Sequence, residues 1–202
     1  GLRPAEPLFA VIQRDPVGLV GGMGVDEVRE MAERLLEIAG GMKDGATLKA
    51  VIPGGSSVPV MPAANIVDLN MDYDSLQKAG SSLGTGSLMI MDESVCMVSV
   101  LRRIARFYHS ESCGQCTPCR EGTGWLHLML NRILAGQGTH ADLERLVGVA
   151  NKIEGHTICA LGDAAAWPIQ GLIRHFRPEI EARINEYRLP RAMVQGAVIA
   201  AE

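Results

Sequence analysis

The residues best suited to do chemistry are the cysteines, of which the chain has 5. Cys113, Cys116 and Cys119 form a C-x2-C-x2-C run. Thiolates at this spacing wrap a compact corner and can ligate three irons of a cubane, so a fourth thiolate must come from elsewhere in the chain. Cys159 is the remote candidate. The pattern predicts a single [4Fe–4S] cluster, because no further cysteine follows Cys119 at the ferredoxin spacing.

Other interpretations fit the same thiols. Four thiolates, or three with His156, could hold a tetrahedral zinc ion, although zinc sites more often pair two C-x2-C knuckles. The thiols could also be plain cysteines. An odd number of cysteines argues against a disulfide framework. Cys96 lies well upstream, and we interpret it as a small buried hydrophobe outside the site.

Several neighbours of the cysteines could tune a cluster by charge or by hydrogen bonds to sulfur. Arg120 directly follows the third cysteine, and Gly114 allows the backbone to approach closely. The hydroxyls of Ser112 and Thr117 are further donors. All four residues are equally explained as turn chemistry, so both roles stay open.

Composition excludes several classes of protein. The 202 residues suffice for one large or two small domains. The net charge of −4 and an aromatic content of 4% argue against nucleic-acid binding, which needs a basic surface and stacking platforms. The sequence contains no run of 18 apolar residues, so it predicts no membrane-spanning helix, and the first residues lack the features of a signal peptide. The loop at residues 54–57 lacks the lysine and the following helix of a phosphate loop, so it predicts a tight turn.

The first half of the chain reads as short strands around one helix. A helix is expected at residues 26–38, where apolar residues repeat at helical spacing. This pattern predicts a small α+β module of the β-grasp type. The expected strands cover residues 8–12, 17–20, 48–52, 58–60 and 88–91.

The second half reads as helices joined by short loops, which predicts a four-helix bundle. Pro168 is expected in the first turn of the fourth helix, and Pro178 at a break within it. The earlier helices are expected to start at residue 93 or 94, at residue 121, and at residue 140 or 142. The expected domains are therefore residues 1–92 with the connecting strand, residues 93–187 as the iron–sulfur bundle, and residues 188–202 as a tail.

Three ordered blocks resemble one known family. They are ESCGQCTPCREG at residues 111–122, EGHTICALGD at residues 154–163, and IPGGSS at residues 52–57. They resemble the NADH- and flavin-binding subunit of respiratory complex I, the NADH:quinone oxidoreductase, over roughly residues 6–187. Related subunits occur in NAD-linked hydrogenases and formate dehydrogenases, but residues 156–163 and the following Trp167-Pro168 look closer to the respiratory version.

The resemblance implies a fold, a cofactor and a role. It implies a β-grasp module of the soluble-ligand-binding type followed by a four-helix bundle. The bundle would hold one [4Fe–4S] cluster on Cys113, Cys116, Cys119 and Cys159, and Ala160 and Leu161 match positions that approach the flavin. Electrons would pass from NADH through FMN and this cluster toward quinone.

The large flavin- and NADH-binding domain of the family has no counterpart in these residues. The sequence therefore looks like the C-terminal part of such a subunit, and this chain alone is not expected to oxidise NADH. The expected partners are that flavin/NADH domain and the neighbouring iron–sulfur subunits, with no nucleic acid and no direct membrane insertion. The expected location is peripheral, on the cytoplasmic face of a bacterial inner membrane or on the mitochondrial matrix side.

Overall fold

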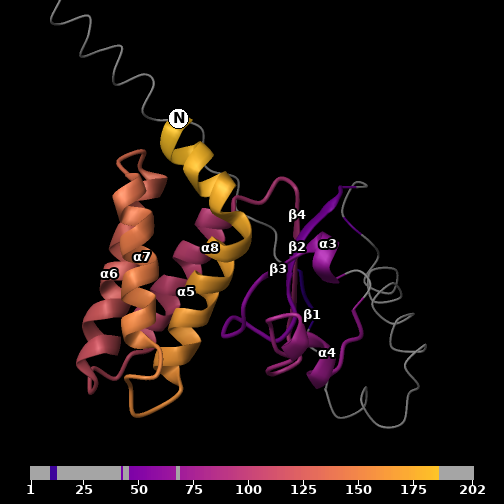
Figure 1. Ribbon diagram of the computed structural model, residues 1–202, viewed down its shortest axis with the longest axis horizontal. Helices are drawn as coiled ribbons and strands as arrows, with labels where there is room; N and C mark the ends of the chain where they lie inside the picture. Colours follow the sequence, from indigo (N-terminus) through magenta and orange to yellow (C-terminus); the bar gives the residue numbers. More distant parts are fainter. Residues whose placement is uncertain (1–9, 13–41, 43–45, 67–68, 187–202) are drawn as a thin grey trace, which may run out of the picture. The chain divides into compact units, whose positions relative to one another are not determined.

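The computed structural model describes residues 10–12, 42, 46–66 and 69–186 (Figure 1). The chain divides into two units, Gly1–Cys96 and Met97–Glu202. The first contains a small antiparallel sheet and the second contains packed helices. The strand expected at residues 17–20, the helix expected at residues 26–38 and the tail at residues 188–202 lie outside the described residues.

The sheet of the first unit has four described strands in the order β1-β4-β2-β3. All neighbouring strands are antiparallel, and Val51 of β2 pairs with Ile90 of β4. Pro62 lies in β3 at the edge of the described sheet, a position where proline is tolerated. The strands span Ala10–Ile12 (β1), Leu48–Ile52 (β2), Met61–Pro62 (β3) and Leu88–Asp92 (β4).

Two short helices complete the described part of this unit. They are α3 at Ala63–Ile66 and α4 at Tyr73–Lys78. Asp72 caps α4 by accepting a hydrogen bond from the Ser75 N–H at 2.7 Å. Apolar side chains of the strands, of both helices and of the loop after α4 form one buried cluster that includes Val51, Met61, Ile66, Leu76, Leu83, Leu88 and Ile90.

The glycine loop after β2 is a tight turn packed on another loop. A Cβ added to Gly54 would lie 2.5 Å from the Leu83 carbonyl carbon, so only glycine fits. The Gly55 N–H donates to the Ser87 carbonyl at 2.7 Å, and the Thr85 N–H donates to the Gly54 carbonyl at 3.1 Å. Because these backbone groups of the loop are hydrogen-bonded to other backbone groups, they support the expected tight turn rather than a phosphate-binding loop.

The described residues of the second unit form four helices that pack on one another (Figure 1). The first and third helices each contact the second and the fourth, and their apolar faces meet in a core that includes Leu101, Leu126, Leu130, Leu146 and Ile169. None of the helices within the described residues is long and apolar enough to span a membrane. The helices are α5 (Met97–Glu111), α6 (Thr117–Leu134), α7 (His140–Ile153) and α8 (Leu161–Glu186).

Several expected helix starts were wrong by a few residues. Helix α5 begins at Met97 rather than at residue 93 or 94, because the Asp92 side chain holds the N–H and the hydroxyl of Ser94 in a turn. Helix α6 begins at Thr117 rather than at residue 121, and Pro118 is tolerated in its first turn.

Helix α8 departs most from expectation. It begins at Leu161, so Pro168 lies inside the helix rather than in its first turn. The expected break near Pro178 is confirmed, because Phe176 has non-helical φ and ψ values of −121° and 19°. In the first unit the strand expected at residues 58–60 was wrong, since β3 begins only at Met61.

Candidate metal centre

The first cysteine loop leads directly into helix α6. Cys116 is the N-cap residue of this helix, and Cys119 is its third residue and only 7% exposed. Gly114 has a φ of +80°, a left-handed conformation that only glycine adopts at little cost. The free N–H groups of a helix N-terminus favour negative charge, so they stabilise thiolates at this position.

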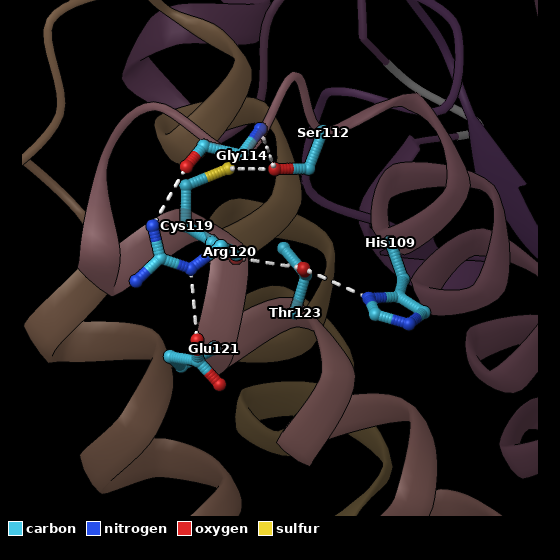
Figure 2. Close-up of polar contacts among 7 residues, drawn as sticks. All are labelled: His109, Ser112, Gly114, Cys119, Arg120, Glu121 and Thr123. Carbon is cyan, nitrogen blue, oxygen red and sulfur yellow. Dashed lines mark hydrogen bonds and ion pairs between the residues drawn. The ribbon is translucent and has the colours of Figure 1, made fainter.

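Cys119 is fixed from two sides (Figure 2). Its Sγ lies 3.2 Å from the Ser112 hydroxyl oxygen. Its carbonyl accepts a 2.7 Å hydrogen bond from the hydroxyl of the buried Thr123, one turn further along α6. The Thr123 hydroxyl also lies 3.4 Å from His109 Nδ1 of α5, so the first turn of α6 is tied to the neighbouring helix.

Arg120 holds the loop against the helix that follows it. Its Nη1 donates to the Gly114 carbonyl at 2.8 Å, and its Nε donates to the Glu121 carboxylate at 2.8 Å (Figure 2). The guanidinium can bond both groups at once, because it presents several donors in a rigid fork. The positions of Ser112 and Gly114 relative to Cys119 therefore depend on Arg120.

The second cysteine loop, residues 154–160, is held by α8. Trp167 Nε1 and Gln170 Nε2 each donate to the Glu154 carboxylate at 2.7 Å. These hydrogen bonds from Gln170 and Trp167 lower the pKa of Glu154, although its partial burial opposes the shift. The Gly155 N–H donates to the Asp163 carboxylate at 2.7 Å. The start of this loop is thus anchored to the first three turns of α8.

The two loops meet at one contact. The Ile158 N–H, one residue before Cys159, donates to Cys116 Sγ at 3.4 Å. This is within the range for a hydrogen bond to sulfur, so the chain segment with the fourth cysteine lies against the segment with the other three. Cys113 and Cys159 are exposed and Cys116 is half-buried, so three of the four predicted thiols face outward at least in part.

The structure brings the two loops together but does not show all four thiols around one point. Within the part of the chain that it describes, no three His, Cys, Asp or Glu side chains stand close enough to hold a single metal ion. The donor set nonetheless fits an iron–sulfur cluster, because soft thiolates are its ligands and a helix N-terminus stabilises the negative charge of a thiolate-bound cluster. The assignment of Cys113, Cys116, Cys119 and Cys159 as ligands stays a prediction.

The two positions expected to approach a flavin lie beside Cys159. Ala160 is exposed, and Leu161 is half-buried as the first residue of α8. Ile158 on the other side of Cys159 is 86% exposed. The tip of the second loop therefore presents apolar side chains to its surroundings. The contact of Ala160 and Leu161 with a flavin stays a prediction.

Sequence reasoning missed the residues that hold the second loop. Glu154 and Asp163 stand inside the block EGHTICALGD, and Trp167 was noted only as a family feature. Trp167 and Gln170 are three residues apart on α8 and so share a face, which is the one signal that could have paired them with Glu154. The expectation that Cys96 is buried was wrong, because this residue is only half-buried.

The histidines of α5 and α6 are not part of the cysteine loops. The rings of His109 and His127 are stacked with centroids 6.3 Å apart. Burial lowers the pKa of His127, and the charges of His109, Arg102 and Arg106 lower it further. His127 is a helix residue whose ring lies 3.1 Å from the Asn131 side-chain amide, one turn further along α6.

Comparison with known proteins defines the class of the helical unit. Residues 99–183 match the family described as the NADH-ubiquinone oxidoreductase-F iron-sulfur binding region. This range contains all four predicted ligand cysteines and both loops that carry them. The prediction that this half of the chain is an iron–sulfur region is therefore confirmed.

The relatives extend this relationship over most of the chain. The F subunit of the NADH-quinone oxidoreductase of Rickettsia rickettsii (strain Sheila Smith) is 53% identical over 173 residues, which are 85% of this chain and 40% of the relative. The first F subunit of the same enzyme in Rhizobium meliloti (strain 1021) is 53% identical over 163 residues, which are 80% of this chain and 37% of the relative. The chain is thus a homologue of part of the F subunit of NADH-quinone oxidoreductase and spans about two fifths of its length.

A solved structure supports the same relationship. The crystal structure of an NAD+-reducing [NiFe]-hydrogenase in the H2-reduced state matches with a TM-score of 0.63 and 32% sequence identity. The match covers 69% of this chain and 24% of the hydrogenase chain. The resemblance to the NADH- and flavin-binding subunit that is shared with NAD-linked hydrogenases is therefore confirmed.

Proposed function

We propose that this chain is the electron-transfer part of an NADH:quinone oxidoreductase, and that its helical unit holds one [4Fe–4S] cluster. The ligands are Cys113, Cys116 and Cys119 from the first loop and Cys159 from the second. The observation that carries the proposal is the 3.4 Å contact between the Ile158 N–H and Cys116 Sγ, since it joins the two loops inside the matched region.

The chain's own residues position and stabilise the thiolates. The N-terminus of α6 favours negative charge on Cys116 and Cys119. Arg120 holds the first loop, and Glu154 with Trp167 and Gln170 holds the second. When bound, a cubane supplies one-electron transfer, so this chain needs no general acid, base or nucleophile.

The proposal places the chain within a larger assembly. The relatives are F subunits of an NADH-quinone oxidoreductase, and their remaining length leaves room for a flavin- and NADH-binding domain. Electrons arrive from NADH-reduced FMN near Ala160 and Leu161, where the tip of the second loop is apolar and exposed. They leave toward a neighbouring iron–sulfur subunit and finally toward quinone. The assembly lies at the cytoplasmic face of a bacterial membrane or on the mitochondrial matrix side.

The finer fold description belongs to the same proposal. We assign the first unit to the β-grasp type and the second to a four-helix iron–sulfur bundle. The antiparallel sheet and the mutual packing of α5 to α8 support this assignment. The expected boundary between residues 92 and 93 falls at the end of β4, four residues before the division between Cys96 and Met97.

The test measures iron, zinc and acid-labile sulfide in the 202-residue chain purified without oxygen, together with the reduced EPR spectrum. About four irons and four sulfides per chain with a cubane signal are expected. One zinc without sulfide, in a colourless protein, would replace the proposal by a zinc-stapled structural or partner-binding module.

A further inference from the structure

The Ser112 hydroxyl is a side-chain donor that points at a predicted ligand sulfur. Its oxygen lies 3.2 Å from Cys119 Sγ (Figure 2). The same oxygen accepts the Gly114 N–H at 3.4 Å. With one lone pair engaged by Gly114, the hydroxyl proton is free to turn toward the sulfur. A ligand thiolate has no proton of its own, so in the cluster-bound protein the hydroxyl is the donor and Cys119 Sγ the acceptor.

We propose that Ser112 sets the reduction potential of the cluster through this hydrogen bond to Cys119 Sγ. The inference rests on the proposed function. Reduction adds negative charge that is shared with the ligand sulfurs, so a donor stabilises the reduced state more than the oxidised state. Ser112 raises the potential in this way and thereby favours the uptake of an electron by the cluster. Ser112 is a positioning residue, because it acts through a ligand.

The surroundings of Ser112 preserve this geometry. Cys119 is 7% exposed, so little water competes for its sulfur. The Arg120 guanidinium donates a hydrogen bond to the Gly114 carbonyl and so holds Gly114 in place. The Gly114 N–H in turn donates to the Ser112 hydroxyl oxygen and orients it. The left-handed φ of +80° at Gly114 sets the course of the chain after it, where the Gly114 carbonyl accepts the hydrogen bond from Arg120. The first cysteine loop and the start of α6 thus hold the Ser112 hydroxyl beside Cys119.

Two other donors near the cysteines provide useful contrasts. The Ile158 N–H donates to Cys116 Sγ, but it is a backbone group that remains in every side-chain variant. The Thr117 side chain is exposed and makes no hydrogen bond to any described residue. Thr117→Ala therefore removes a hydroxyl from the same motif without touching a ligand sulfur, and it is the matched control for Ser112→Ala.

The experiment is an EPR-monitored redox titration of the cluster-loaded 202-residue chain, as the wild type and as three variants. Ser112→Ala is expected to make the cluster up to about tenfold harder to reduce, a shift of up to about 59 mV to lower potential for one electron. Ser112→Thr keeps the hydroxyl and is expected to titrate near the wild type. Thr117→Ala is expected to titrate like the wild type.

The outcomes separate this inference from the proposed function. A wild-type chain without iron and sulfide would overturn both. A loaded Ser112→Ala variant with the wild-type potential would overturn the role of Ser112 alone, and so would an equal shift in Thr117→Ala. If Ser112→Ala binds no cluster, the reduction potential of Arg120→Lys tests the inference instead. Lysine keeps the positive charge but lacks the guanidinium that holds the Gly114 carbonyl. A lower potential in that variant supports the inference, and an unchanged one overturns it.

Discussion

The two cysteine loops of the helical unit are held in different ways. The first loop and the start of α6 are tied together within residues 112–123, by Arg120 on Gly114, by Ser112 on Cys119 and by Thr123 on the Cys119 carbonyl. The second loop is tied to α8, where Gln170 stands 16 residues from its partner Glu154. The segment with three predicted ligands is held by residues of its own motif, whereas the segment with the single predicted ligand is held by the helix that follows it.

Glycine has a different task in each loop. Gly114 supplies a left-handed φ, and a Cβ there would approach only Arg120 Cδ at 3.6 Å. Gly162 supplies space, because a Cβ there would lie 2.6 Å from Thr157 Cγ2. The first loop thus depends on backbone conformation, and the second depends on close packing against the start of α8.

The largest expected effect is loss of the fourth ligand. Cys159→Ser should lose the cluster or convert it to one with fewer irons, because a serine hydroxyl is a poor substitute for thiolate. Iron and sulfide analysis with EPR measures this. Cys96→Ser is the control and should keep the wild-type iron content. Full iron content and an unchanged spectrum in Cys159→Ser would show that the second loop does not supply a ligand.

The sequence was sufficient to identify the first loop and only part of the second. The run C-x2-C-x2-C is local, so its spacing alone indicates the chemistry. Its predicted helix start at residue 121 was still wrong, because a cysteine is an unusual N-cap and the signal lay in Pro118 instead. Cys159 was identified because it was the remote cysteine that remained, but its anchoring by Trp167 and Gln170 depends on where α8 begins.

The helix boundaries explain why that anchoring was missed. Proline is common in the first turn of a helix, so we expected the fourth helix to start near Pro168. That expectation left residues 161–167 outside the helix. In the structure α8 continues through Pro168, which is buried. Tertiary packing compensates for the backbone hydrogen bond that a proline interrupts, and such compensation is not visible in local sequence. The apolar spacing in α5 and α7, by contrast, predicted helices that the structure confirms.

The second prediction tests close packing in the second loop. Gly162→Ala should force Thr157 to move and should cost about 1–3 kcal/mol of stability, as overpacking usually does. Cluster retention during dilution without oxygen should fall as well, because Thr157 lies two residues from Cys159. Urea unfolding and iron analysis provide both readouts.

Gly148→Ala is the matched control for this substitution. An added Cβ meets nothing within 4 Å there, and the residue is exposed on α7. Alanine in an exposed helix position should raise stability by about 0.5–1 kcal/mol. Equal stability changes in the two variants would show that the loop tolerates movement at Gly162.

The third prediction concerns Asp142 in the first turn of α7, away from both cysteine loops. Asp142 is 1% exposed and forms a capping box with Thr139, and Arg132 and Arg145 pair with its carboxylate. Burial raises the pKa of Asp142, but the hydrogen bonds from Thr139 and the two arginines outweigh it, so the pKa is lowered overall. Asp142→Asn should cost about 1–2 kcal/mol without changing the potential of the cluster.

The pH dependence of this effect has a definite sign. A lowered folded-state pKa means that the stabilisation by Asp142 is complete above its ordinary pKa of 3.8 and is lost as the pH falls through the folded value. The stability difference between wild type and Asp142→Asn should therefore be constant from about pH 8 to about pH 5 in urea unfolding. A difference that already shrinks between about pH 7 and pH 5 would contradict this assignment.

The smallest expected effect comes from the anchor of the second loop. Glu154→Gln replaces a carboxylate that accepts two hydrogen bonds by an amide that offers one acceptor oxygen. Because the loop is partly exposed, we expect a loss of only about 1 kcal/mol in overall stability. The loss should be confined to the second loop, since Glu154 joins that loop to Trp167 and Gln170.

Amide hydrogen exchange isolates that local effect. In Glu154→Gln the N–H groups of Gly155 and Ile158 should exchange about fivefold faster, which corresponds to the loss of about 1 kcal/mol of local protection. The N–H of Arg120, which donates to the Cys116 carbonyl in the first loop, should keep its rate. Glu144→Gln, which removes an exposed partner of Arg177, should change neither loop. If Arg120 exchanges faster together with Ile158, the two loops open as one unit, and the contact between Ile158 and Cys116 then couples them more strongly than their separate anchors suggest.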